Sequence, residues 1–146
     1  KKVLVFASYR HSIDTISAFL DKQKITSEKI HGDISASKRA LIFSKFQTED
    51  APRVLVIQPQ AASHGVTLTA ADTIVFWGPV MSVETYLQCI ARADRVGQNS
   101  DKVTVVHIQA SDIERRMFKQ LSNRVEDHNS LIELYKEELA ETKIEV

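Results

Sequence analysis

The chain has 146 residues, 43% of them hydrophobic and 26% charged, which is typical of one globular domain and too short for two ordinary ones. Lys plus Arg and Asp plus Glu each number 19, so the net charge gives no nucleic-acid signature. No apolar run approaches the roughly 20 residues of a membrane helix, and Val3–Ala7 is too short for a signal peptide. Cys89 is the only cysteine and has no partner for an internal disulfide. We therefore expect a cytoplasmic protein without a membrane partner.

Short apolar runs rich in β-branched residues recur along the first 110 residues and predict buried strands. These runs are Val3–Phe6, Lys29–His31, Arg53–Ile57, Thr73–Trp77 and Val103–Ile108.

Amphipathic stretches between these runs predict helices. The first presents Ile13, Ile16, Phe19 and Leu20, the second follows the N-cap Ser35 and presents Ile42 and Phe46, and the third opens at Ser82 and presents Val83, Leu87, Ile90 and Ala91. The alternation predicts an α/β fold, a three-layer α/β/α sandwich with a mainly parallel sheet.

From Ser111 onward the sequence has a helical pattern and no further strand-like run. Ser111 and Glu114 have capping-box spacing, and apolar residues then repeat at helical intervals. They are Ile113, Met117, Leu121 and Val125, followed by a second helical segment with Leu131, Ile132, Tyr135 and Leu139. We expect residues 1–110 to form the α/β lobe and residues 111–146 a helical extension packed on it.

Ligands of open α/β sheets collect at the carboxyl ends of the strands. That rule selects Ser8–Arg10, Gly32–Asp33, Gln58–Thr69 and the stretch after Trp77.

The densest chemical signal is the string from Gln88 to Gln98, QCIARADRVGQ. Arg92 and Arg95 are three residues apart and would share one face of a helix, where two guanidinium groups suit a polyphosphate. Gln88 lies one turn earlier and could reach the same ligand, while Gly97 would stop the helix and free Gln98. An isolated R-x-x-R is more often a pair of surface charges, so the surrounding sequence must show whether these arginines bind a ligand.

That string resembles motif VI of superfamily 2 helicases in its Swi/Snf-type form, Q-x-x-x-R-x-x-R-x-G-Q, at every fixed position. Val3–Tyr9 resembles motif IV, and Ser63–Asp72 (SHGVTLTAAD) resembles motif V, usually G-x-G-L-N-L-T-A-A-D. The segment from His31 to Phe46 resembles the part of the family between them. The chain is thus identified as similar to a Swi/Snf-type C-terminal RecA-like lobe.

The resemblance implies half of an ATP site. Arg92 and Arg95 would act as arginine fingers on the γ-phosphate, and Gln88 and Gly65 would help to close the site. The first RecA-like lobe would supply the phosphate loop and the Mg²⁺ ligands, since no G-x-x-x-x-G-K-[ST] occurs here. We therefore expect this lobe alone not to hydrolyse ATP.

The resemblance also implies contacts to a nucleic-acid backbone, with DNA favoured. The candidates are Ser8, Tyr9, Gly32, Thr67 and Thr69, with electrostatic help from Arg39; turn and cap roles are the alternative for each. The scattered histidines and single cysteine argue against a zinc site.

Departures from the family pattern favour a divergent branch, bacterial or phage. Ser63 replaces the first Gly of motif V, Thr67 replaces its Asn, and Asp94 stands where His is frequent. A strand-separating helicase, and a degenerate lobe that binds without hydrolysis, stay open as alternatives to a duplex translocase. The abrupt start within a strand leads us to expect that the chain belongs to a longer protein.

Overall fold

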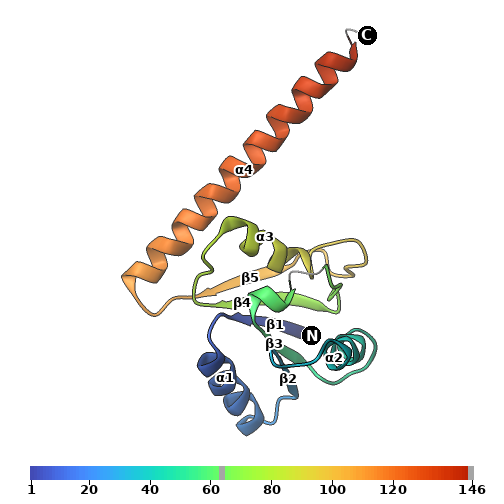
Figure 1. The fold of residues 1–146 in the computed structure, drawn as a ribbon, viewed down its shortest axis with the longest axis vertical. Coiled ribbons are helices and arrows are strands. Elements are labelled where there is room, and N and C mark those ends of the chain that lie inside the picture. Colours follow the sequence, from blue (N-terminus) through green and yellow to red (C-terminus); the bar gives the residue numbers. More distant parts are fainter. Residues whose placement is uncertain (63–64, 145–146) are drawn as a thin grey trace.

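The computed structural model describes residues 1–62 and 65–144 (Figure 1). Its strands are β1 (Lys2–Ala7), β2 (Ser27–Ile30), β3 (Val54–Ile57), β4 (Ala71–Trp77) and β5 (Thr104–Ile108). Its helices are α1 (Arg10–Lys22), α2 (Ala36–Thr48), the short 3-10 helix η1 (Pro59–Ala62), α3 (Val83–Ala91) and α4 (Asp112–Ile144). All five expected strands are therefore present, with ends that differ by a few residues.

The strands form one parallel sheet in the order β2-β3-β1-β4-β5. β1 lies at its centre, pairing Val5 with Val56 of β3 on one side and with Val75 of β4 on the other. A central parallel strand is buried on both faces, which explains the nearly continuous apolar sequence of β1. The α/β prediction is confirmed.

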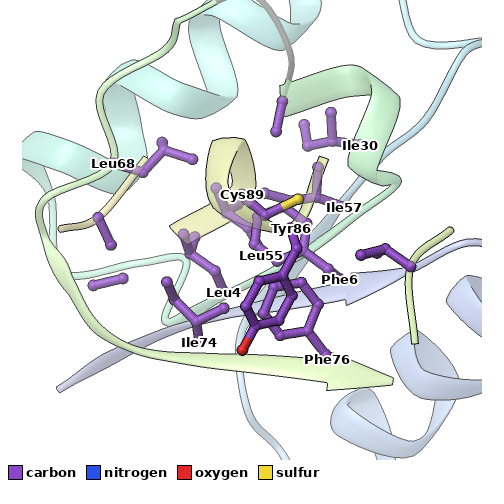
Figure 2. Packing of buried hydrophobic residues seen from close by; sticks show 14 of the residues in the cluster. Leu4, Phe6, Ile30, Leu55, Ile57, Leu68, Ile74, Phe76, Tyr86 and Cys89 are labelled. Atoms are coloured by element: carbon purple, nitrogen blue, oxygen red, sulfur yellow. The ribbon is translucent and has the colours of Figure 1, made fainter. Parts of the chain in front are cut away.

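Helices cover the two faces of the sheet unequally. Alternate residues of β1, β3 and β4, such as Leu4, Phe6 and Phe76, pack in the larger core with α2, α3 and the start of α4. Figure 2 shows Tyr86 and Cys89 of α3 in this core. The opposite face carries a smaller core with α1.

The face on the α1 side is left partly open over β1, β3 and β4. An apolar groove of ≈ 330 Å³ lies there, lined by α1 residues and by strand residues including Val75 and Trp77. Phe19, which shares its helical face with Ile16 and Leu20 as expected, lines this groove with them and is 59% exposed. On α3 the buried residues are Tyr86 and Cys89, and Ile90 is partly buried against the same core.

Helix α4 leaves the domain as a single rod (Figure 1). Its first turns are anchored by Phe118 and Leu121, which are 2% and 4% exposed. The Ser111 hydroxyl accepts from the amide of Glu114 at 3.2 Å, as predicted, but the Glu114 carboxylate accepts from Ala110 rather than from Ser111. In the described part of the chain, none of the helices combines the length and hydropathy that crossing a bilayer requires.

Candidate functional site: two edges of one sheet

The predicted site residues lie at opposite edges of the sheet. Ser8 and Gly32 follow the carboxyl ends of β1 and β2, whereas Thr69 lies two residues before the amino end of β4. Because all the strands run parallel, these positions are separated by the length of a strand. The stretch from Gln58 to Thr69 starts at the carboxyl edge and ends at the amino edge, so it does not form one ligand-binding loop.

The two arginines lie at the amino edge, in a turn and not on a helix. Helix α3 ends at Ala91 and Arg92 is its C-cap, so the expectation that both arginines project from one helical face was wrong. The Arg92 carbonyl accepts a hydrogen bond from the amide of Leu68 at 2.8 Å instead of continuing the helix. A tertiary hydrogen bond thus ends the helix five residues before Gly97.

Arg92 is a buried cation with an unused donor. Its side chain is 9% exposed, and Nε donates to the carbonyl of Gln88 at 2.9 Å. The Nη1 atom is buried and has no hydrogen-bond partner among the described residues. Burial, and then the nearby charge of Arg95, lower the pKa of Arg92. A buried guanidinium group with an unpaired donor lowers the stability of the fold unless an anion accepts its hydrogen bond.

Gly65 joins the two arginines. The Nη1 atom of Arg95 donates to the Gly65 carbonyl at 3.2 Å, and a Cβ added at Gly65 would lie 3.5 Å from Nη1 of Arg92. Gly65 has a φ of +76°, which favours glycine. The structure therefore brings Arg92, Arg95 and Gly65 together, and this arrangement can bind an anion. The Gln88 side chain is exposed one turn before Arg92.

Gln98 and Gly97, the last residues of motif VI, stabilise the turn that holds the arginines. The Nε2 atom of Gln98 donates to the carbonyls of Ala71 and Ala93 at 2.8 and 2.9 Å, so the expectation that Gln98 is free was wrong. Gly97 has a φ of +102° and packs against Thr69. Cys89 lies in the core, where burial raises the pKa of its thiol to about 12, so the thiol stays protonated.

Thr69 is held by a residue that the sequence did not single out. Its Oγ1 atom accepts from Nε2 of Gln47 at 3.1 Å, while Oε1 of Gln47 accepts from the amide of Ala70 at 2.7 Å. Thr67 is exposed in the same segment. Ser63, noted as a departure in motif V, lies outside the described residues.

The carboxyl edge carries the other candidates. Tyr9 is 76% exposed and Gly32 is exposed, and the amide of Gly32 donates to Oε1 of Gln58 at 3.2 Å. Nε2 of the same Gln58 side chain lies 3.5 Å from the carbonyl of Ser8, so the glutamine links the turns after β1 and β2. Sequence reasoning placed Gln58 at this edge but gave it no such role.

An ion pair joins the same two turns: Nη1 of Arg10 lies 2.7 Å from the Asp33 carboxylate. The hydrogen bond from Arg10 lowers the pKa of Asp33. Arg39 is half-buried on α2, beside Phe43 and Val66. Among residues 1–62 and 65–144, no group of three or more His, Cys, Asp or Glu could hold a metal ion.

The parallel α/β lobe, with paired arginines at one edge of the sheet and polar turns at the other, is of the RecA-like class. The fold is that of the solved C-terminal part of the Fun30 ATPase domain, with a TM-score of 0.74 and 21% identity over 82% of this chain and 38% of that one.

Residues 1–97 match the helicase conserved C-terminal domain, and the chain belongs to this family, in its SWI/SNF-type branch. It is 38% identical over 110 residues to the SWI/SNF-related matrix-associated actin-dependent regulator of chromatin subfamily A-like protein 1 homolog of Caenorhabditis elegans, covering 75% of this chain and 16% of that protein. It is 30% identical over 131 residues to the DNA excision repair protein ERCC-6 of Homo sapiens, covering 86% and 9%. The chain thus spans less than a fifth of either relative.

Proposed function

We propose that this chain is the second motor lobe of a DNA-dependent ATPase that translocates on duplex DNA, with Arg92 and Arg95 supplied to ATP held by a first RecA-like lobe. The buried, unpartnered Nη1 of Arg92, beside Arg95 and Gly65, carries the proposal. Family membership supports a helicase-type ATPase, and one relative is named for chromodomain, helicase and DNA binding. DNA as the substrate implies an intracellular location.

The arrangement fits phosphate chemistry. During phosphoryl transfer charge gathers on the equatorial oxygens of the γ-phosphoryl group, and guanidinium donors stabilise that charge. Nη1 of Arg92 would donate to one such oxygen, and the more exposed Arg95 would approach another. Gly65 leaves the space between them free of a side chain, and Gln88 would close the site. Mg²⁺, when bound, neutralises phosphate charge; we assign its ligands to the first lobe.

We further propose that DNA backbone phosphates bind at the carboxyl edge. Ser8 and Tyr9 offer a hydroxyl group and a phenol there, and Arg39 adds positive charge nearby. Gly32 leaves room for a close approach of the backbone, although its own amide already donates to Gln58. Thr67 is exposed and stays a candidate contact. The Thr69 hydroxyl already bonds Gln47, so we assign it to holding the loop and not to DNA.

The test is ATP hydrolysis by the full-length protein with and without duplex DNA. Arg92→Ala and Arg95→Ala are each expected to lower the DNA-stimulated kcat by about 10²-fold or more while ATP binding is largely kept. Arg115→Ala is the matched control, because Arg115 is exposed on α4 and pairs only with Asp112 among the described ion pairs.

Hydrolysis that survives both substitutions refutes the arginine-finger role. A full-length protein that binds DNA but never hydrolyses ATP would instead be a degenerate binding module. A strand-displacement assay separates a duplex translocase, which leaves the strands paired, from a strand-separating helicase.

A further inference from the structure

Gln47 links helix α2 to the loop that precedes β4. It lies near the C-terminal end of α2, and its amide makes two hydrogen bonds, donating to Oγ1 of Thr69 and accepting from the amide of Ala70. Its neighbour Thr48 differs, because the Thr48 hydroxyl donates to Ser44 within the same helix at 2.8 Å. Both hydrogen bonds of the Gln47 side-chain amide are therefore made to the loop and not to helix α2.

The loop held by Gln47 is the one that positions both arginines. The amide of Leu68, one residue before Thr69, donates to the Arg92 carbonyl at 2.8 Å. The carbonyl of Gly65 accepts from Arg95 at 3.2 Å. A Cβ added at Gly97, two residues after Arg95, would lie 3.6 Å from Oγ1 of Thr69.

We propose that Gln47 is a positioning residue for ATP hydrolysis. Its side-chain amide fixes residues 65–70, and this segment in turn sets where Arg92 and Arg95 stand relative to the phosphates. The inference rests on the proposed arginine role and adds α2 to the machinery of the site. A displacement of about 1 Å in catalytic groups can cost 10²-fold in rate, so losing one clamp that acts through a loop should cost about tenfold.

Steady-state kinetics on the full-length protein with saturating DNA test the contact. Gln47→Leu keeps the size of the side chain and removes both hydrogen bonds. It is expected to lower kcat about tenfold and to leave KM for ATP within about twofold, because arginine fingers act mainly on the transition state. Thr48→Val is the matched control and should leave both constants unchanged.

The contact can also be tested from its other side. Thr69→Val removes the hydroxyl at nearly constant shape and should lower kcat. Thr69→Ser restores the acceptor and should recover most of the rate. These two Thr69 variants test the positioning role of Gln47 even if Gln47→Leu does not fold. Equal rates for Thr69→Val and Thr69→Ser would overturn the proposal.

A double-mutant comparison separates positioning from general destabilisation. If Gln47 acts through the arginine loop, adding Gln47→Leu to the Arg92→Ala/Arg95→Ala double variant should lower kcat by less than about twofold further, because both groups being positioned are already gone. A full additional tenfold loss would overturn the positioning role. If Arg92→Ala and Arg95→Ala themselves leave kcat unchanged, the proposed arginine role is refuted, and the role of Gln47 is refuted with it. If they abolish turnover but Gln47→Leu does not, only the present inference fails.

Discussion

Phe118 is expected to be the main anchor of α4 on the domain. Its side chain is 2% exposed, and its ring stacks on that of His107 with centroids 4.0 Å apart and planes 10° apart. Phe118→Ala removes this ring from a closed core, a change that typically costs 3–5 kcal/mol, about as much as the whole stability of a marginal domain. Leu121 and the partly buried Val125 would then hold the helix on the core.

Urea unfolding followed by circular dichroism measures the loss. NMR titration of His107 supplies a second readout, because burial lowers the pKa of His107 and removing Phe118 admits water to one face of its ring. The pKa of His107 should therefore rise toward its ordinary value of 6.5. Ile113→Ala is the control on the same helix: Ile113 is 68% exposed, so the cost should stay within about 0.5 kcal/mol. A loss below about 1 kcal/mol with an unchanged His107 pKa would refute the anchoring role.

Three further predictions concern stability. Gly97→Ala should cost about 1–2 kcal/mol in a urea titration because its φ of +102° disfavours any Cβ, whereas Gly32→Ala, with open space around it, should change little; equal costs would contradict this. Burial lowers the pKa of His107 and His31 below 6.5 in the folded chain, so as the pH falls the unfolded chain takes up protons first. The melting temperature should therefore be steady above about pH 7 and fall as the pH drops below 6.5, and a rise on acidification would show the sign to be wrong. Ser35→Ala removes the N-cap acceptor of α2 and should cost about 1 kcal/mol, while no loss would mean that solvent caps the helix equally well.

Strands and helix starts were readable from the sequence because they depend on local chemistry. The β-branched run of β3, for example, can only be buried, and Ser35 and Ser82 both cap the helices they were predicted to open. Helical periodicity placed Phe19 on the same face as Ile16 and Leu20, but it could not show that the sheet beneath this face is only partly covered. The end of α3 was misplaced because a hydrogen bond from Leu68, distant in sequence, decides it.

In the candidate site, too, local sequence predicted some residues and tertiary contacts determined others. Motif spacing pointed to Arg92, Arg95 and Gly65, and the structure does bring these three together. Gln47 was missed, and Gln58 was placed at its edge without a role, because the role of a glutamine depends on which loops the fold brings within reach of its amide. The sequence also could not show that the polar turns and the arginines occupy opposite edges, since strand direction alone sets that separation.

That separation has an electrostatic consequence. The central strand β1, six residues long, holds the two edges roughly 20 Å apart, about twice the distance over which charges interact at physiological ionic strength. If phosphates bind at both proposed sites, one at Arg92 would therefore be largely screened from one near Ser8. Coupling between the two sites would then have to be mechanical, through rigid-body movement of the sheet.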